Sequence, residues 1–479
     1  MGLTGDGECY TCDCMENEQA PAADERRPAS RENAPLIFEG ARGTAVKLLC
    51  RYESSDSYID KLLDGELRRG ELQQADKALV TELVSGTVRW QARLDWILAG
   101  FYHGDYPKCL PIVRNALRIA LYQMLFLSKI PPPAAINESV EIVKRFKGDR
   151  SAGIVNGVLR NILRNITNLR YPSKDEDLAA HLAVLYSHPK WMVKRYLSRY
   201  GDVGAEELMS ANNHRPMLTL RVNAFRSSLD LVTQALNESE IKWEPSPVHP
   251  NSIMITSLRD VRSSPLFDQG MITIQDASAS LAVQLASPKP GMTVYDLCAA
   301  PGGKAVYAAE LMQNTGKLVA LEKYESKIAL IGENARRAGV SIIEPTAGDA
   351  LTFDPGAPAD LVLVDAPCSG LGTMSKKPDI KWRRTMEDVR SMARFQSSIL
   401  DHAATLVRPG GTIVYSTCTT EPEENAMVVH DFLQRHPEFR LDDASQYVDA
   451  SVVTDGMVQT FPHKHRCDGA FAARLVRNS

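Results

Sequence analysis

Residues 294 to 304 read Val294-Tyr295-Asp296-Leu297-Cys298-Ala299-Ala300-Pro301-Gly302-Gly303-Lys304. A short apolar run passes into a turn rich in glycine, and a helix-forming stretch begins at Lys304. Glycine lets the backbone approach a ligand closely, and the first turn of a helix offers free N–H groups. The spacing is neither the Gly-x-Gly-x-x-Gly dinucleotide pattern nor the phosphate-binding Gly-x-x-x-x-Gly-Lys-Ser/Thr loop. The stretch therefore predicts a strand, a turn and a helix that bind a compact ligand at the end of the strand.

This stretch lies in a region of alternating strands and helices that runs to the carboxyl terminus. Strands are expected at residues 293–297, 317–321, 341–344, 360–364 and 411–416, and helices at 304–312, 326–339 and 386–406. Such alternation indicates a mostly parallel sheet with helices on both faces. Residues 271–479 are therefore predicted to form a Rossmann-like domain whose ligand lies at the carboxyl edge of its strands.

The first half of the chain is organised differently. Residues 1–34 are rich in Glu, Asp, Ala, Pro and Asn, with almost no large apolar residues, so they are expected to form a disordered tail. Residues 35–170 carry apolar side chains at helix-face spacing, which predicts an all-α bundle. Residues 171–270 add a helical linker and a small α/β module, with strands at 218–222 and 252–255 around one helix. The predicted fold is multidomain, with α domains first and the Rossmann-like α/β domain last.

Composition excludes several classes of protein. The 479 residues are 44% apolar and 24% charged, as in globular proteins that fold in water. No apolar stretch approaches the length of a membrane span, and no secretory signal is evident. Nine cysteines, an odd number, do not suggest a disulfide framework. A cytoplasmic protein without membrane contact is expected. Because Cys9, Cys12 and Cys14 have no matching fourth ligand nearby, no metal site is expected.

Two cysteines follow neighbouring strands of the predicted sheet. Cys368 lies in Asp365-Ala366-Pro367-Cys368-Ser369-Gly370-Leu371-Gly372, and Cys418 lies in Tyr415-Ser416-Thr417-Cys418-Thr419. A thiolate that adds to carbon 6 of cytosine makes carbon 5 able to accept a methyl cation, and a second thiol can help the product leave. The reaction needs an exposed cysteine of lowered pKa, a pocket for an unstacked base and a carboxylate for the base's polar edge, which Asp365 supplies. The pair predicts methylation of a cytosine ring carbon.

Two carboxylates follow the other strands of the same sheet. Glu322 comes after the second strand, where a carboxylate can accept both hydroxyls of a ribose. Asp349 comes after the third strand and could accept a hydrogen from an adenine amino group. Together with the loop at residues 298–304 they describe an adenosyl ligand without a diphosphate. S-adenosyl-L-methionine fits this description.

The net charge of −4 does not by itself indicate nucleic-acid binding, but contact with phosphates needs only a local patch. One basic cluster comprises Lys376, Lys377, Lys381, Arg383 and Arg384, and a second comprises Arg145, Lys147, Arg150, Arg160, Arg164 and Arg170. We interpret the first cluster as functional because it adjoins the proposed site. The second is equally consistent with a solvated helix face.

At these motifs the sequence closely resembles the RsmB/Sun (Fmu) family of bacterial ribosomal-RNA cytosine-5 methyltransferases. The resemblance covers nearly everything after residue 36 and rests on residues 296–304, 365–372, 377–382 and 415–419. Residues 76–84, 121–126 and 155–160 resemble NusB, an RNA-binding antitermination factor. This amino-terminal extension separates the RsmB type from shorter relatives that act on transfer RNA.

The resemblance implies a role for each candidate residue. Cys418 would be the nucleophile, and Cys368 would assist release of the methylated base. Cofactor contacts would come from Cys298, Ala299, Ala300, Pro301, Gly302, Gly303, Lys304, Glu322, Asp349 and Asp365. Lys377 to Trp382 would help to form an RNA-facing wall. In DNA cytosine methyltransferases the Pro-Cys thiol attacks, so the reverse assignment of the two thiols stays open.

The resulting prediction is a 16S rRNA (cytosine-C5)-methyltransferase that acts as a monomer. Its substrate would be one cytosine, of the position-967 type, in small-subunit ribosomal RNA before the subunit is complete, with the NusB-like domain docking the RNA. Two alternatives stay open. One is a transfer-RNA cytosine-5 methyltransferase, against which the helical domain argues. The other is a non-catalytic RNA-binding ribosome assembly factor, against which the retained thiols and acids argue.

Overall fold

The computed structural model describes residues 38–69, 72–256 and 264–479. The expected disordered tail, with Cys9, Cys12 and Cys14, lies outside the described residues. Within those described ranges, no helix has the length and apolar character needed to span a bilayer.

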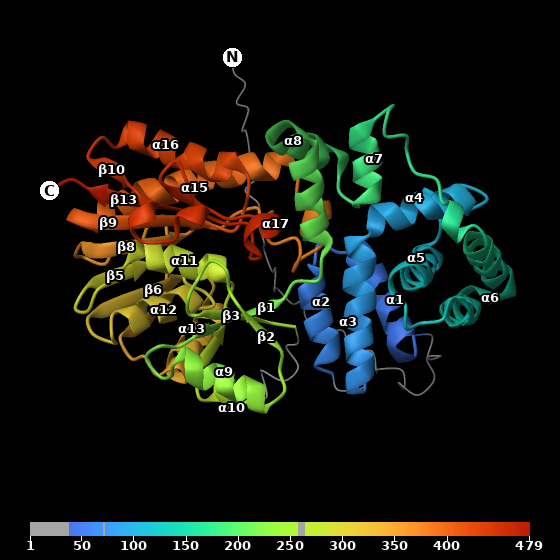
Figure 1. The fold of residues 1–479 in the computed structure, drawn as a ribbon, viewed down its shortest axis with the longest axis horizontal. Helices are drawn as coiled ribbons and strands as arrows, with labels where there is room; N and C mark the ends of the chain where they lie inside the picture. The colour runs from blue at the N-terminus through green and yellow to red at the C-terminus, as the bar shows by residue number, and fades with distance from the viewer. Residues whose placement is uncertain (1–37, 70–71, 257–263) are drawn as a thin grey trace, which may run out of the picture. The chain divides into compact units, whose positions relative to one another are not determined.

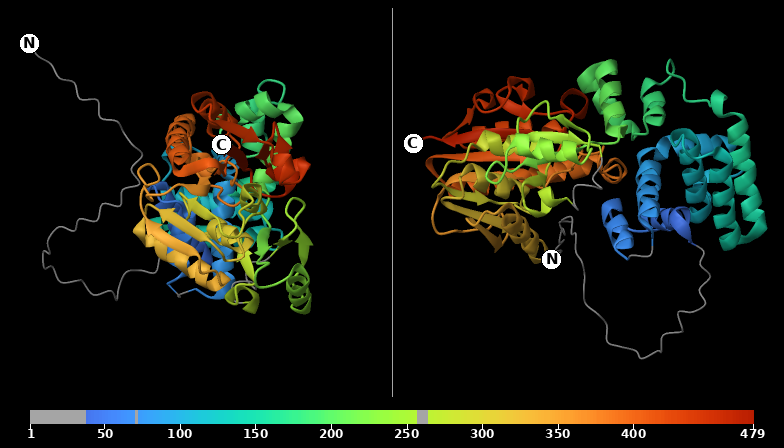
Figure 2. Two further views of the ribbon diagram at one scale, coloured as in Figure 1. Left: turned by 90° about the vertical axis from the view of Figure 1, so that its left-hand side faces the viewer. Right: turned by 60° about the horizontal axis from the view of Figure 1, so that its bottom comes forward.

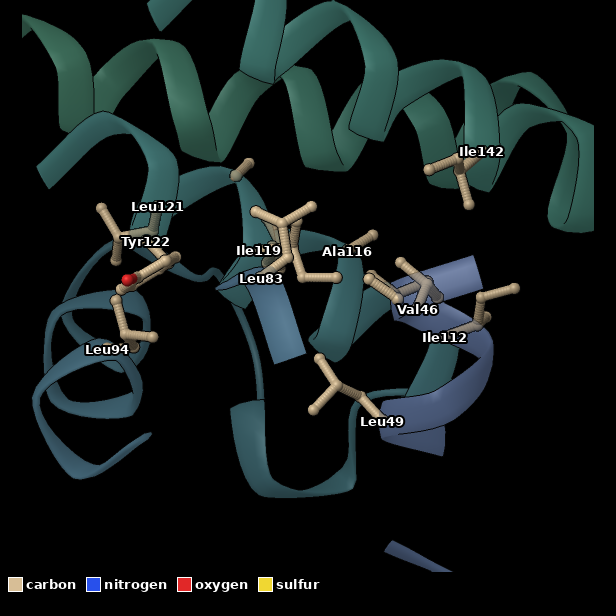
Figure 3. Packing of buried hydrophobic residues seen from close by; sticks show 14 of the residues in the cluster. Val46, Leu49, Leu83, Leu94, Ile112, Ala116, Ile119, Leu121, Tyr122 and Ile142 are labelled. Atoms are coloured by element: carbon tan, nitrogen blue, oxygen red, sulfur yellow. The ribbon is translucent and has the colours of Figure 1, made fainter. Parts of the chain in front are cut away.

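An all-α domain begins the described chain, as predicted. Its helices are α1 (Gly40–Glu53), α2 (Ile59–Leu67), α3 (Gln74–Arg89), α4 (Gln91–Phe101), α5 (Pro111–Phe126) and α6 (Pro132–Arg164). Helix α5 is buried along most of its length because α1, α3, α4 and α6 surround it. Figure 3 shows this packing, with Val46, Leu83 and Ile142 among the side chains of the core. Gly148, at a φ of +76°, interrupts α6 and divides it into two helical parts.

Two helices then lead into a small α/β module. They are α7 (Leu178–Leu185) and α8 (Lys190–Asn213), and the module contains β1 (Leu218–Val222), α9 (Leu229–Glu238), β2 (Trp243–Pro245), β3 (Ser252–Ile255), α10 (Pro265–Asp268) and β4 (Ile272–Ile274). Its sheet has the antiparallel order β2-β3-β1-β4. The strands expected at 218–222 and 252–255 are present. Because β4 pairs with β1, this sheet extends past residue 270, where the sequence placed the end of the module.

The carboxyl-terminal domain is built on one large sheet. Its elements are α11 (Ala277–Ala286), β5 (Thr293–Asp296), α12 (Gly303–Leu311), β6 (Lys317–Glu322), α13 (Glu325–Ala338), β7 (Ile343–Ala347), β8 (Ala359–Asp365), α14 (Ile380–Arg383), α15 (Met386–Leu406), β9 (Val407–Thr417), α16 (Ala426–Arg435), β10 (Phe439–Asp442), β11 (Val453–Thr454), β12 (Met457–Gln459), α17 (Pro462–His465) and β13 (Phe471–Arg477). The sheet order is β11-β12-β13-β9-β8-β5-β6-β7, with β10 paired to β13. Strands β5 to β9 are parallel, as predicted, and β13 pairs antiparallel with β9.

Helices cover both faces of this sheet (Figure 1). Successive strand residues alternate between the faces. Val294 and Leu361 pack in one core with α11, α12 and α13, whereas Tyr295 and Val362 pack in another with α15 and α16. The apolar runs of β5 and β8 are continuous because both of their faces are buried.

The strand order creates a crevice beside β5. The chain runs from β5 through α12 to β6 and then β7 on one side, and returns to β8 on the other side of β5. Ligands of open parallel sheets bind outside the carboxyl ends of the strands at such a reversal. The loops that follow β5 and β8 therefore form the expected ligand site.

A segment after this site joins the carboxyl-terminal domain to the helical domain, which Figure 2 shows in blue to teal. We call Ser375–Arg384 the docking segment. Its contacts are Arg89 Nη2 to the Ser375 carbonyl at 2.7 Å, the Ile59 N–H to Asp379 Oδ2 at 2.9 Å, Trp382 Nε1 to the Val88 carbonyl at 2.8 Å, and Arg383 Nη2 to the carbonyls of Tyr52, Ser55 and Ser57 at 2.8 to 3.0 Å. The Trp382 ring packs against the helical core.

This arrangement bears on two expectations from the sequence. Most basic side chains of the cluster at residues 376–384 have partners within the protein, and the RNA-facing wall of Lys377 to Trp382 stays a prediction. Of the five basic side chains, Lys377 is exposed, Lys381 is buried against Asn213, and Arg384 donates to the Ser369 carbonyl. The basic cluster does follow Cys368 closely in the sequence, but its main contacts join the carboxyl-terminal domain to the helical domain.

Candidate active site

The carboxyl ends of five parallel strands bring the candidate residues to one edge. Strand β9 leads to Cys418, and β8 leads to Asp365 and Cys368. Strand β5 leads to the loop of residues 297–302, β6 ends at Glu322, and β7 is followed by Asp349. Since the strands are neighbours in the order β9-β8-β5-β6-β7, the thiols lie on one side of the β5 loop and the two acids lie on the other.

The two thiols are in contact with each other. Their Sγ atoms are 3.0 Å apart, and the backbone N–H of Cys418 donates to Cys368 Sγ at 3.3 Å. Cys418 is exposed and Cys368 is half-buried. Both sulfurs therefore meet where a planar base can reach Cys418 first.

Their surroundings shift the pKa values of the two thiols in opposite directions. The hydrogen bond from Cys368 lowers the pKa of Cys418, and the Lys304 ammonium acts in the same direction against burial and the charge of Asp365. The pKa of Cys368 is raised well above its usual value by its hydrogen bond to Cys418, by burial, and by the charges of Cys418 and Glu424. Because the thiolate is the nucleophilic form, Cys418 is the sulfur better prepared to attack.

Lys304 projects from the first turn of α12 toward the thiols. Its Nζ lies 2.6 Å from Asp365 Oδ2, and Ser416 Oγ donates to Asp365 Oδ1 at 3.0 Å. Burial opposes the charged form of Lys304, but Asp365 prevails and raises the pKa of the ammonium. Asp365 thus holds a cation beside Cys418. Its direct contact to cofactor or cytosine stays a prediction.

The β5 loop has the features of a cofactor cradle. A Cβ on Gly302, whose φ is +102°, would lie 3.2 Å from Ile331 Cα, so the turn needs glycine. Asp296 is buried, and its Oδ2 has no hydrogen-bond partner among the residues that the structure describes. Burial and the charge of Asp365 raise the pKa of Asp296 to about 7. An unpaired buried carboxylate of this kind fits a ligand that brings a positive charge or donor groups.

The acids of the neighbouring strands are engaged to different extents. Glu322 Oε1 accepts from the Tyr324 N–H at 3.0 Å, and no partner for Oε2 lies in the described part of the chain. Asp349 Oδ1 accepts from the Leu351 N–H at 2.9 Å, while Oδ2 pairs with the exposed Lys323 at 3.2 Å. The acceptor carboxylates of Asp296 and Glu322, together with the glycine turn, fit S-adenosyl-L-methionine, which carries a ribose and two cationic groups.

Cys298 belongs to the cradle and not to the thiol pair. It is half-buried, and burial together with the charge of Asp296 raises its pKa above the usual value. A neutral thiol at this place can line a cofactor pocket but is a poor nucleophile.

A close backbone crossing shapes the floor of the thiol site. The Gly469 N–H donates to the Gly372 carbonyl at 2.9 Å, and the Gly372 N–H donates to the Cys418 carbonyl at 3.1 Å. A Cβ on Gly372 would lie 1.7 Å from the Gly469 carbonyl oxygen. Glycine is therefore required where the segments that carry Cys368, Cys418 and Asp468 meet.

Sequence reasoning missed the pairing of Lys376 with two carboxylates, and it missed the buried Glu424. Lys376 pairs with Asp468 at 2.8 Å and with Asp276, and burial and Asp276 raise the pKa of Asp468 to about 7. Glu424 is fully buried behind the thiol loops and accepts hydrogen bonds from Ser369. The signal for Glu424 was present in Glu421-Pro422-Glu423-Glu424, a run of acids directly after a candidate nucleophile.

Models of known protein families match three successive parts of the chain. The model of the family "16S rRNA methyltransferase RsmB/F" matches residues 283–476. The NusB family matches residues 39–164, and the RsmF/B-like ferredoxin-like domain matches residues 188–262.

Named relatives match over nearly the whole chain. A "Probable ribosomal RNA small subunit methyltransferase B" of Bacillus subtilis is 38% identical over 91% of this chain and 98% of its own length. A protein of the same name from Synechocystis is 34% identical over 91% of this chain and 99% of its own. "Ribosomal RNA small subunit methyltransferase B" of Erwinia tasmaniensis is 35% identical over 84% of this chain and 91% of its own.

Solved structures share the fold. The crystal structure titled PH0851 covers 91% of this chain and 98% of its own, with a TM-score of 0.73 and 26% identity. A methyltransferase homolog from Pyrococcus horikoshii covers 62% of this chain and 97% of its own, with a TM-score of 0.55 and 27% identity. On these matches and the cradle geometry, the chain belongs to the RsmB/F methyltransferase family and uses S-adenosyl-L-methionine as its methyl donor.

Proposed function

We propose that this protein methylates carbon 5 of a cytosine in 16S ribosomal RNA through a covalent cysteine adduct, at a position of the 967 type. The observation that carries the proposal is the contact of Cys418 and Cys368 beside Lys304. A lone buried cysteine has no need of a second thiol at 3.0 Å and a cation nearby. The names of the relatives support ribosomal RNA as the substrate.

Cys418 opens the reaction. Its thiolate bonds to carbon 6 of an unstacked cytosine, and the electrons of the 5,6 double bond move to carbon 5. Lys304 lowers the energy of the thiolate before attack, and Asp365 keeps Lys304 in place. The bound cofactor supplies a methyl cation equivalent, which carbon 5 accepts.

Cys368 serves the second half of the reaction. The proton on carbon 5 passes to solvent water, and the electrons of that carbon–hydrogen bond restore the 5,6 double bond and expel Cys418 as thiolate. Cys368 assists this release from its position next to the carbon–sulfur bond. The reverse assignment, with Cys368 attacking, is less favourable because its hydrogen bond to Cys418 and its burial raise the pKa of Cys368.

The helical domain docks the RNA in this proposal. Arg150, Arg160 and Arg164 are exposed on the part of α6 that follows Gly148. Basic side chains along one helix can contact successive phosphates. The match of residues 39–164 to the NusB family supports the same role. We place the enzyme in the cytoplasm as a monomer that acts before the small subunit is complete.

The test measures transfer of radiolabel from S-adenosyl-L-methionine to small-subunit ribosomal RNA, with bisulfite mapping of the product. Label on carbon 5 of one cytosine is the expected result. Label on transfer RNA alone would favour the transfer-RNA methyltransferase. Cofactor binding without transfer to any RNA would favour a non-catalytic assembly factor.

A further inference from the structure

The thiol pair depends on two loops that follow different strands. Cys368 lies in the loop after β8, and Cys418 lies in the loop after β9. A sulfur–sulfur distance of 3.0 Å requires that these loops be fixed against each other to within a fraction of an ångström. The group that holds the two loops together is buried behind them, at the same edge of the sheet.

Glu424 provides that connection. Its Oε2 accepts from the Ser369 N–H at 2.8 Å, and its Oε1 accepts from Ser369 Oγ. Ser369 is the residue after Cys368, whereas Glu424 belongs to the loop of Cys418. Ser369 Oγ also lies 3.0 Å from Thr419 Oγ1, next to Cys418. The two loops are therefore joined directly behind the sulfurs.

The residue before Cys368 is held from the same centre. Gln396 of α15 donates to Glu424 Oε2 at 2.9 Å and to the Pro367 carbonyl at 2.9 Å. Pro367 and Ser369 are thus both anchored, one on each side of Cys368. All groups that hydrogen-bond to the carboxylate of Glu424 are donors, which is the pattern that an ionised carboxylate requires.

The charge of Glu424 is not balanced by a cation. Its side chain is fully buried, and no basic residue in the described part of the chain forms an ion pair with it. Burial raises the pKa of Glu424 above its usual value, although the hydrogen bonds from Ser369 and Gln396 oppose this shift. Removing a carboxylate from water is costly, and the three donors from Ser369 and Gln396 offset this cost for Glu424 without a neutralising cation. Lys304 lies on the side of Cys418 and Glu424 on the side of Cys368, so the two charges act oppositely on the two sulfurs.

We propose that Glu424 is a positioning residue of the methyl-transfer reaction: it locks the Cys368 loop to the Cys418 loop, and its charge keeps the shared proton on Cys368 so that Cys418 is the attacking sulfur. The inference rests on the proposed function for its consequence in turnover. The distribution of the proton between the thiols is independent of RNA.

The decisive experiment alkylates the full-length protein with iodoacetamide between pH 6 and pH 9 and locates the label by peptide mass spectrometry. In the wild type we expect Cys418 to react before Cys368, while the buried Cys109 and Cys467 serve as internal references. Glu424→Gln keeps the shape of the side chain and removes its charge. We expect the Cys368-to-Cys418 labelling ratio to rise about tenfold, as for a change of about one pKa unit between the thiols.

Turnover gives the second readout. Glu424→Gln should lower kcat by about 10²-fold, the effect of misplacing a reacting group, with the KM for RNA nearly unchanged. Glu424→Asp retains the charge but shortens the reach, so it should lower kcat while the labelling ratio stays as in the wild type. Ser369→Ala removes one contact and retains the charge, and it should also preserve the ratio.

Each outcome is decisive. A purely structural role predicts an unchanged labelling ratio in Glu424→Gln, and that result overturns the proposal. If Glu424→Gln does not fold, Glu424→Asp decides, because wild-type kcat in that variant excludes a positioning role. A wild-type protein that labels at Cys418 but methylates no cytosine would instead remove the proposed function and leave the thiol asymmetry intact.

Discussion

Asp379 accepts a hydrogen bond at 2.9 Å from the backbone N–H of Ile59, at the first residue of helix α2. The two residues belong to different domains, and both are almost fully buried. The carboxylate satisfies an N–H group that the helix itself leaves unpaired. The docking segment therefore completes the helical domain, while its Arg384 donates to the carbonyl of Ser369, the residue after Cys368.

Replacing Asp379 with Ala should loosen this contact. The Ile59 N–H would be left buried without a partner, at a cost of about 1–3 kcal/mol. We expect faster hydrogen exchange in the docking segment and in α2, and a lower kcat. Glu387→Ala, at an exposed position of α15, is the matched control and should change neither. Unchanged exchange in Asp379→Ala would show that the segment is held by other contacts.

The two thiol variants should have opposite phenotypes. Cys418→Ala removes the proposed nucleophile, so both turnover and any protein–RNA adduct should be lost. Cys368→Ala should accumulate an adduct that survives a denaturing gel, because release is impaired after attack. If the adduct appears in Cys418→Ala instead, the roles are reversed.

Cofactor affinity should depend on pH through Asp296. Its pKa of about 7, against 3.8 for an ordinary aspartate, means that the native protein holds this proton longer than the unfolded chain does. Between pH 3.8 and about 7, Asp296 is ionised in the unfolded chain but still protonated in the native protein, so the cofactor-free protein loses stability as pH rises. A cationic ligand binds the ionised form of Asp296 more tightly, so its affinity should increase with pH up to about 7 and then level off. Calorimetric titration checks this, and Asp296→Asn should bind weakly with no such dependence. An identical pH profile in the variant would count against Asp296.

A buried ion pair joins the small module to the cofactor helix. Arg221 of β1 is fully buried and pairs with Glu310 of α12, with a second contact at 3.1 Å. Glu310→Ala leaves a buried guanidinium without its partner and should reduce the free energy of unfolding by about 3–5 kcal/mol. Urea denaturation measures the loss. The control is Asp431→Ala, which removes one partner of the exposed Arg435 and should cost at most about 1 kcal/mol. Comparable losses in both variants would contradict the assignment.

RNA affinity should depend on the exposed arginines of α6. Replacing Arg150, Arg160 and Arg164 together with Gln should weaken RNA binding, and should reduce the slope of log affinity against log salt by roughly one for each phosphate that is no longer neutralised. Filter binding at several salt concentrations provides the measurement. Cofactor affinity should be unaffected because the cradle lies in another domain. A full salt slope in the variant would place the RNA elsewhere.

The residues at the carboxyl edge of the large sheet could be predicted from the sequence. Apolar runs buried on both faces mark β5, β8 and β9 clearly, so the residues that follow them could be placed at one edge from the order of amino acids alone. The meeting of Cys368 and Cys418 follows from that placement. The antiparallel partner β13 was not predicted, because its pairing with β9 joins distant parts of the chain and leaves no local pattern.

The burial of charged residues could not be predicted from the local sequence. Lys381 and Glu424 look like surface residues in sequence because their partners come from other elements, Asn213 from α8 and Ser369 from the β8 loop. A basic cluster and a run of acids are usually solvated, so local composition does not indicate that Lys381 or Glu424 is buried. Only the assembled domains supply the hydrogen bonds that permit these groups to be buried.

The docking segment has a consequence for the order of synthesis. Residues 38–170 are translated before the docking segment and form a bundle from local contacts, which is the fast class of folding. The surface that receives Trp382 and Arg383 therefore exists before those residues are translated. The catalytic domain therefore folds against a helical domain that has already formed. A carboxyl-terminal fragment made alone would expose the indole of Trp382 and several unpaired hydrogen-bond donors to solvent, and it would tend to aggregate.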